Sequence, residues 1–358
     1  MRELDERAVE AAVAGGSVLA CGGGGWVPHG YLVGRTAISY GAPRLVTVEE
    51  LDPEALIVMV SAIGAPAAEN WEMRPADYVR ALELLAAELD EPIVGTITAQ
   101  NGSSTTCNGW IQSAVLGTVV VDAAGDGRAH PTGKLGSIGL TSDTEYTAIQ
   151  AVAGGNREAG RYLECVVRGS VSSCADVLRA ASVQSGGFIS AARNPVRASY
   201  VAEHAAVGAI TFALELGEAM LAAEARGGEA VIEAIKTQLG GEIIARGSVR
   251  GRLLRTEGAF DIGELAVGEL ELGFVNEYLS ADAAGERLAT FPDALTTLSA
   301  STGRPVSIAD IRDGDEIAVL SVEHERIPLG SSVLDRSLYP EVEAMLGRPL
   351  ASYVFDAS

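Results

Sequence analysis

Lysine is almost absent from this chain. Of its 26 basic residues only Lys134 and Lys236 are lysines, and neither lies near the glycine-rich stretch "CGGGGWVPHG" at residues 21–30. That stretch therefore lacks the lysine that a phosphate-binding P-loop places directly after its glycines. The chain also has no G-x-S-x-G motif, which argues against an enzyme of the α/β-hydrolase fold.

Cysteine and histidine are also scarce. The four cysteines have no C-x-x-C spacing, so we expect free thiols in a reducing compartment rather than a disulfide framework. The four histidines never pair three or four residues apart, and no H-E-x-x-H motif occurs. The sequence therefore contains no metal motif on a single helix.

Positive charge is scarce relative to negative charge, and the formal net charge is -22. Such a chain repels the phosphates of nucleic acids and the surface of anionic membranes. The acidic N-terminal stretch has a helical pattern rather than that of a signal peptide, and the longest apolar run, 205–214, is too short to span a membrane. We expect a cytoplasmic protein that binds neither nucleic acid nor membrane.

The N-terminal half is predicted to alternate helices and short apolar strands. This alternation indicates a mostly parallel sheet covered by helices on both faces. The predicted elements are a helix at 3–14 ended by Gly15 and Gly16, a strand at 17–21, a helix from Pro28 to Ile38, strands at 44–48 and 56–60, a helix at 74–89, and strands at 92–99 and 117–123.

The second half changes in character. Residues 166–187 and 207–241 have helical patterns, and from Glu242 short alternating segments punctuated by glycine predict a small β-barrel or sandwich. The predicted fold class is α/β: an N-terminal layered, mostly parallel α/β domain at 1–165, and a C-terminal β-rich, barrel-like domain with helices at 166–358.

Four loops rich in glycine and small polar residues follow the predicted strands of the first half: 21–30, 61–71, 99–109 and 122–133. The carboxyl ends of neighbouring parallel strands lie at one edge of a sheet, where ligands bind in open α/β folds. We therefore expect these loops to converge on the functional site.

The glycine run at 22–25 does not complete a dinucleotide-binding fingerprint, because Val27 stands where the third glycine is required. A tight turn that lets a ligand or another backbone segment approach is the better interpretation. A turn without ligand contact remains an equal alternative.

Polar residues in the converging loops are candidates for chemistry. His29, His130 and Asp122 are candidate ligands of a divalent metal such as zinc, although a lone histidine is more often a hydrogen-bonded scaffold residue. Asp122 could act as a general base or could cap loop amides and pair with Arg128. Cys107 would be a nucleophile at a helix N-terminus, but a small buried cysteine is the commoner case.

Several stretches together resemble one family, the S-methyl thiohydantoin desulfurases. The glycine run at 22–25 and the later Gly64-Ala65-Pro66 match in order, and "DAAGDGRAHPT" at 122–132 is similar to the family's D-A-D-G-x-G-R-A-F-P-E. In the second half, "GFVNEYL", "ATFPDALTTLSASTGRPV" and "IRDGDEIAVL" resemble family stretches, so the resemblance covers most of the chain.

The resemblance implies an N-terminal α/β domain joined to a β-rich domain. It also implies attack by water on a ring carbon of a five-membered cyclic imide or its sulfur analogue. A hydantoinase- or oxoprolinase-type protein is the implied partner. The residues that match the family motifs are Asp122, Gly127, Arg128, Asn276, Glu277 and Asp293.

The chain departs from the family pattern at its acids. Ala124 replaces the second acid of D-A-D, and Thr132 replaces the acid after the proline, with His130 at the aromatic position. The family's E-x-G-G corresponds to "AQNG" at 99–102, which has no acid. If those acids carry the chemistry, this chain has rebuilt its site or lost it.

Two functions therefore compete. The first is a hydrolase of hydantoin- or thiohydantoin-type rings, in which Asp122 or His130 handles protons or a metal and Arg128 holds a negative oxygen or a carboxylate. The second is a non-catalytic accessory subunit that binds a small ligand or a partner. Either function is compatible with a homo-oligomer. The predicted catalytic residues are Asp122, Arg128, His130 and Cys107, and the predicted substrate-binding residues are Gly23, Gly24, Gly25, Gly64, Asn101, Gly127, Asn276 and Glu277.

Overall fold

The first part of the chain folds around a mixed sheet whose central strands run parallel. The computed structural model describes residues 1–65 and 67–356. The strands of this sheet are β1 (Arg2–Glu3), β2 (Arg44–Val46), β3 (Leu56–Gly64), β4 (Gly95–Thr98), β5 (Val119–Ala124), β6 (Ala148–Gly154), β7 (Leu163–Gly169), β8 (Phe188–Arg197) and β9 (Ala206–Val207). Their order is β1-β2-β5-β4-β3-β8-β6-β7, with β9 against β5. The pairs β2–β5, β5–β4 and β4–β3 are parallel, and the flanking pairs are antiparallel.

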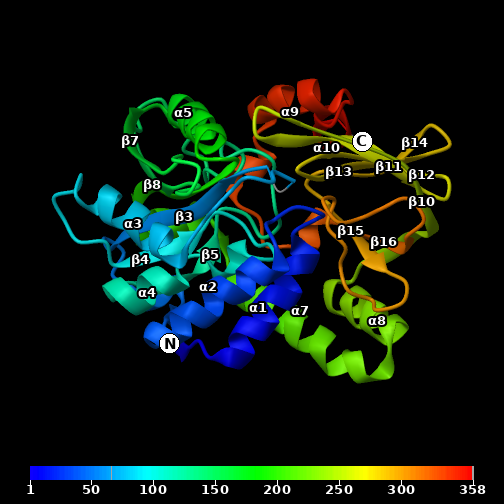
Figure 1. The fold of residues 1–358 in the computed structure, drawn as a ribbon, viewed down its shortest axis with the longest axis horizontal. Helices are drawn as coiled ribbons and strands as arrows, with labels where there is room; N and C mark the ends of the chain where they lie inside the picture. Colours follow the sequence, from blue (N-terminus) through cyan, green and yellow to red (C-terminus); the bar gives the residue numbers. More distant parts are fainter. Residues whose placement is uncertain (66, 357–358) are drawn as a thin grey trace.

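Helices cover both faces of this sheet (Figure 1). One face carries α1 (Glu6–Leu19), α2 (Val27–Tyr40), α3 (Pro75–Ala86), α4 (Trp110–Leu116) and α7 (Ala209–Ala223), and the other carries α5 (Val171–Gln184) and α6 (Ala198–His204). Strand β3 is continuously apolar because both of its faces are buried. Val58 and Val60 pack beneath α3, whereas Ile57 and Met59 face the opposite core. Both faces of the strand are therefore withdrawn from water.

Helix α1 differs from its prediction. It runs through Gly15 and Gly16 to Leu19, so the predicted helix end at 14 and the predicted strand at 17–21 are both wrong. A Cβ at Gly15 would lie 1.9 Å from the carbonyl oxygen of Ala213 in α7, so the glycine allows two helix backbones to touch. Tertiary packing thus overrides the low helix propensity of glycine.

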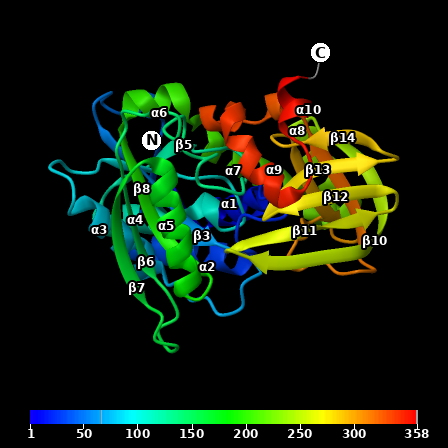
Figure 2. The ribbon, with the colours of Figure 1, turned by 90° about the horizontal axis from the view of Figure 1, so that it is seen from above.

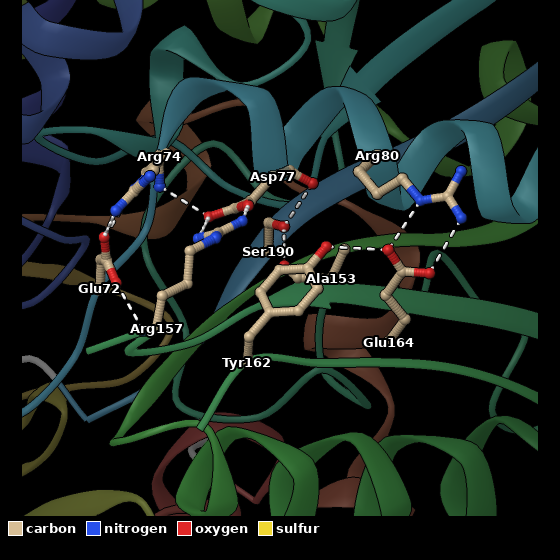
Figure 3. Close-up of polar contacts among 9 residues, drawn as sticks. All are labelled: Glu72, Arg74, Asp77, Arg80, Ala153, Arg157, Tyr162, Glu164 and Ser190. Carbon is tan, nitrogen blue, oxygen red and sulfur yellow. Dashed lines mark hydrogen bonds and ion pairs between the residues drawn. The ribbon is translucent and has the colours of Figure 1, made fainter. Parts of the chain in front are cut away.

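Helix α3 is fixed at its first turn by the carboxylate and the backbone carbonyl group of Asp77 (Figure 3). Asp77 is 1% exposed, accepts a hydrogen bond from the Arg74 amide at 2.8 Å, and pairs with Arg157 at 2.6 Å. Ser190 of β8 donates to the carbonyl oxygens of both Asp77 and Ala153. This first turn of α3 is therefore tied to both β6 and β8.

The second part of the chain forms an antiparallel, strongly bent sheet, visible on the right of Figure 2. Its strands are β10 (Glu242–Glu257), β11 (Phe260–Val267), β12 (Leu270–Val275), β13 (Glu277–Ala283), β14 (Glu286–Thr290), β15 (Ala294–Ser299) and β16 (Glu316–Val322). The order is β14-β13-β12-β11-β10-β16-β15. The long strand β10 has register shifts against both neighbours, so the sheet curves into a half-barrel.

Three further helices pack near this second sheet. Helix α8 (Gly228–Leu239) buries an apolar face against β15 and β16, and α9 (Tyr339–Leu346) and α10 (Ala351–Phe355) join the core beside β12 and β13. The 3-10 turns are η1 (Val48–Glu50), η2 (Thr105–Cys107), η3 (Glu224–Arg226), η4 (His324–Arg326), η5 (Ser331–Leu334) and η6 (Arg336–Leu338). Helix α7 contributes to the cores of both sheets and so joins the two parts.

The predicted fold class, a mostly parallel α/β layer followed by a β-rich part with helices, is confirmed. The helical prediction for 166–187 holds only from Val171, because the residues before it complete β7. The domain division at 165 remains a prediction, and β8 and β9 of the first sheet lie beyond it. No helix in the described residues combines the length and apolar character needed to cross a membrane.

The contact between α1 and α7 generates a stability prediction. A Cβ at Gly217 of α7 would lie 1.9 Å from the carbonyl oxygen of Ala11. We expect Gly217→Ala to lower the free energy of unfolding by about 1–3 kcal/mol, because overpacking outweighs the gain of roughly 1 kcal/mol in helix propensity. Denaturant unfolding measures this change. Glu215→Ala, on the exposed side of the same helix, is the control, and equal stability of the two variants would contradict the prediction.

Candidate functional site

The four predicted loops meet around one cavity of about 200 Å³. The glycine loop, the end of β3, the loop after β4 and the loop after β5 form one side, and α5, β8, β11, α9 and the turn between β12 and β13 form the other. One detail differs from the prediction, because the glycine loop follows α1 rather than a strand. The cavity therefore lies where the two sheets of the molecule adjoin.

Polar atoms without partners converge on this cavity. Five of its lining side chains have a buried atom that no hydrogen-bonding group in the described residues reaches: Ser61 Oγ, Thr105 Oγ1, His130 Nδ1, Arg193 Nε and Glu277 Oε2. Leaving a buried polar group unpaired costs roughly 1–3 kcal/mol, and more for a charged group. Such a concentration of unpaired groups in one hollow is typical of a site built for a polar ligand.

Glu277 is the acid of this cavity. It is 2% exposed, and burial raises the pKa of its carboxyl to about 8, against the opposing effects of Arg128, Arg179 and the Gly24 amide. Its carboxyl group is therefore largely protonated at neutral pH and can donate a proton to a bound molecule.

The turn before Glu277 holds it in place. Asn276 has a φ of +58°, a left-handed conformation that asparagine tolerates better than most residues. Its amide donates to the carbonyl oxygen of Asp261 at 2.7 Å, and its side-chain oxygen accepts from the Asp261 amide at 2.9 Å. Asn276 also lines the cavity. It therefore fixes both the strand connection and the direction of the next side chain.

The glycine run lies directly against this acid. A Cβ at Gly23 would lie 2.4 Å from Glu277 Oε1, and one at Gly25 would lie 2.0 Å from Ser104 Oγ. Gly24 has a φ of +67° and lines the cavity with Gly25. The run is therefore a tight turn that places the backbone of Gly24 and Gly25 at the cavity, and contact with a ligand stays a prediction.

His130 lines the cavity as a neutral ring. Burial lowers its pKa to about 4, and its Nε2 lies 3.2 Å from the carbonyl oxygen of Ala99. With Nε2 donating to that oxygen, Nδ1 carries the lone pair and makes no hydrogen bond of good geometry in the described part of the chain, although the Thr132 backbone lies close enough to raise the pKa of the ring slightly. His130 can therefore accept a hydrogen bond from a ligand or a water molecule.

Two arginines complete the walls. Arg193 of β8 is 4% exposed, and Arg179 of α5 donates to the carbonyl oxygens of Ala259, Pro131 and Gly64 at 3.1, 3.3 and 3.4 Å. Burial lowers the pKa of each to about 10, so both remain charged at neutral pH.

Neither Arg193 nor Arg179 was predicted from the sequence as a site residue. An arginine inside the apolar stretch "FISAARNPV" was the available signal for Arg193.

Other predicted site residues serve the scaffold. Asp122 accepts hydrogen bonds from the amides of Ile210 and Thr211 and from the Thr211 hydroxyl. It therefore caps the start of α7, in line with the predicted capping role. Asn101 donates to the carbonyl oxygens of Gly127 and Ala209. Their polar atoms contact backbone and hydroxyl groups of the scaffold rather than the cavity.

Arg128 does not pair with Asp122. It is fully buried and donates to the carbonyl oxygens of Ala129, Tyr278 and Asp293. Its side chain thus joins the loop after β5 to the second sheet.

Of the two predicted substrate-binding glycines Gly127 and Gly64, only Gly64 lines the cavity. A Cβ at Gly127 would lie 2.1 Å from the carbonyl oxygen of Pro328, so this glycine permits close contact between loops. Gly64 lines the cavity at the end of β3, and Pro66 of the same motif lies outside the described residues.

The three predicted metal ligands are not brought together. His29 lies 3.1 Å from the Tyr78 hydroxyl beside Trp26 and Trp71, His130 lies in the cavity, and Asp122 caps a helix. Within residues 1–65 and 67–356 no group of three or more His, Cys, Asp or Glu side chains is arranged to hold a metal ion. Each predicted ligand is instead engaged by its own local neighbours.

Cys107 is buried in η2, and burial raises the pKa of its thiol to about 12. The predicted lowering of this pKa by a helix N-terminus is absent, because η2 is a single 3-10 turn in an apolar core. A thiol held protonated is a poor nucleophile.

Comparison with known proteins identifies both parts of the chain. Residues 7–157 match the family model "S-Me-THD-like, N-terminal domain", and residues 169–327 match "S-Me-THD-like, C-terminal domain". A crystal structure of a structural-genomics target protein from Chromobacterium violaceum is similar over 96% of this chain and 97% of its own, with 23% identity and a TM-score of 0.72. At that identity the likeness supports the fold alone. No curated protein matches the chain.

The departures from the family's acidic pattern can now be located. Ala99 and Thr132 both line the cavity, whereas Ala124 packs with Ala206 and Ala209 away from it. Two of the positions where the resemblance implies an acid therefore line the cavity with neutral side chains.

The burial of Cys107 predicts how the thiols react. In native protein treated with iodoacetamide at pH 8, we expect Cys107 to be alkylated at least about tenfold more slowly than the partly exposed Cys165. Mass spectrometry of the digested protein measures both rates. Equal labelling of the two thiols would mean that Cys107 is accessible and activated.

Proposed function

This chain belongs to the S-Me-THD-like family, and we propose that it is a hydrolase of hydantoin- or thiohydantoin-type rings acting in the cavity around Glu277. The observation that carries the proposal is a buried, protonated carboxyl group at the cavity, whose Oε2 atom has no hydrogen-bond partner in the described residues. An acid with a pKa near the working pH is suited to both giving and taking a proton.

For an S-methyl thiohydantoin, the reaction consumes one water and releases methanethiol. Glu277 donates its proton to the ring nitrogen beside the carbon that bears sulfur, and the water oxygen forms a bond to that carbon. A water proton passes to the Glu277 carboxylate, which restores the acid. The carbon–sulfur bond then breaks, the leaving thiolate takes the remaining hydroxyl proton through solvent, and a carbonyl forms on the ring.

Neighbouring groups have matching roles in this proposal. The lone pair on His130 Nδ1 accepts a hydrogen bond from the attacking water, since burial keeps the ring neutral. The Gly24 backbone lies against the acid, and Asn276 fixes its direction. Holding acid and water in fixed positions supplies a large part of the rate enhancement in such reactions.

A second candidate is an accessory subunit that binds a ring compound for a hydantoinase- or oxoprolinase-type protein. It is favoured by the scaffold roles of Asp122, Arg128 and Asn101 and by the neutral Ala99 and Thr132 in the cavity wall. Turnover distinguishes the two candidates, because an accessory subunit binds the ring without changing it.

Replacement of the acid tests the hydrolase directly. We expect Glu277→Gln to lower kcat/KM on an S-methyl thiohydantoin by about 100-fold or more, because the amide cannot donate a proton at useful strength. In the unmodified protein kcat/KM should be flat below pH 8 and fall about tenfold per pH unit above it, since the protonated form with a pKa of about 8 is the active one. Methanethiol release, detected with a disulfide reagent, measures both the loss of activity in Glu277→Gln and the pH profile of the unmodified protein.

Glu286→Gln, at an exposed position of β14, is the matched control and should keep full activity. A rate that rises above pH 8 would make Glu277 a base rather than an acid. Ring binding without turnover of any S-methyl thiohydantoin, thiohydantoin or hydantoin would favour the accessory subunit.

A further inference from the structure

We infer that the ring compound bound here carries a carboxylate, which Arg193 and Arg179 bind at the wall formed by β8 and α5. The ring part of this inference rests on the proposed function, whereas the anion site follows from the two arginines alone. It narrows the substrate class to acidic rings, such as a hydantoin or thiohydantoin with a short carboxylic side chain.

Arg193 has an unusual environment for a buried charge. It is 4% exposed and lines the cavity, yet no hydrogen bond or ion pair reaches its guanidinium from the described residues. A buried arginine almost always has a carboxylate or several carbonyl partners, because an unpaired charge in a protein interior is strongly unfavourable. The missing partner is supplied by an anion that enters the cavity.

The surrounding backbone makes room for this guanidinium. A Cβ at Gly133 would lie 2.4 Å from Arg193 Nη1. Gly133 itself lines the cavity between Thr132 and Lys134. The loop after β5 therefore leaves space for the arginine but offers it no acceptor.

Arg179 lies close enough to lower the pKa of Arg193 through like charge, after the larger effect of burial. Three carbonyl oxygens orient Arg179, and its guanidinium stacks 4.2 Å from the centroid of the Phe260 ring. These neutral partners fix its position, and the acids that act on its charge through space, Asp176 and Glu341, make no ion pair with it and instead pair with Lys134. Two such arginines present the planar, multiple N–H donors that suit a carboxylate.

The other charges near the cavity offset only one of the two arginines. Lys134 lies 3.0 Å from Asp176 and 2.8 Å from Glu341, and Glu277 is largely protonated at neutral pH. This ammonium and two carboxylates leave a single negative charge, and Arg128 and Asp261, which also act on Glu277, are of opposite sign. The cavity is thus positive by about one charge within a chain of net charge -22. A monoanion completes this balance, whereas a phosphate dianion would add repulsion with the nearby acids.

A pair of isosteric rings tests the inference. Binding of 5-carboxymethylhydantoin and its neutral amide, 5-carbamoylmethylhydantoin, is measured by calorimetry without any need for turnover. We expect the acid to bind the unmodified protein about 10- to 100-fold more tightly than the amide, as charge-assisted hydrogen bonds predict. In Arg193→Met that preference should fall below about threefold.

Arg168→Met is the control, because Arg168 lies on the surface of β7 and pairs with Glu88. It should keep the full preference for the acid. Equal binding of acid and amide to the unmodified protein, or a preference that survives in Arg193→Met, would overturn the inference.

Glutaramate, an open-chain molecule with a single carboxylate, separates this inference from the proposed function. If neither ring binds but glutaramate does, and Arg193→Met abolishes that binding, the anion site stands and the ring chemistry fails. If glutaramate and both rings fail to bind, both proposals fall.

Thermal unfolding without ligand adds a readout that a structural role would move in the opposite direction. Removal of an unpaired buried charge should leave the Tm of Arg193→Met unchanged or raise it. A lowered Tm together with an unchanged preference for the acid would identify Arg193 as a scaffold residue and refute the inference.

Discussion

The burial of Glu277 and Arg193 in one cavity is the constraint around which the site is organised, because Glu277 Oε2 and the Arg193 guanidinium have no hydrogen-bond partner in the described chain. Burial opposes the ionised form of the carboxyl group and raises its pKa, while the guanidinium retains its proton and its charge. A fold that served stability alone would pair these groups or replace them with apolar residues. Their retention is a cost in stability, which the proposed ligand offsets in our account.

Much of the surrounding structure holds these two side chains in place. Arg128 joins the loop after β5 to the second sheet through carbonyl oxygens, and Asp122 caps α7, which contributes to both cores. The glycine run and Asn276 then bring backbone and strand connection against Glu277. Motif residues such as Arg128 and Asp122 therefore do not contact the cavity through their polar atoms. They fix the loops that line it.

The sequence predicted the fold class and the meeting of four loops, because apolar periodicity and glycine-rich strand ends are local signals. It misassigned residues 15–21, where contact between α1 and α7 stabilises helix through two glycines. It named Glu277 and His130 but missed Arg193 and Arg179, which come from β8 and α5. Their convergence depends on β8 pairing antiparallel beside β3, a long-range arrangement that one sequence does not encode in any local pattern.

The protonation state of Glu277 links the cavity, the proposed acid and the charge balance, so its direct titration tests the account best. A ¹³C NMR titration of protein labelled at the glutamate side chains, compared with the same spectra of Glu277→Gln, isolates this carboxyl. The account predicts a titration near pH 8, well above the ordinary value of 4.5. A titration near 4.5 would mean an ionised Glu277 at neutral pH, which would contradict both the proton donor and the positive cavity.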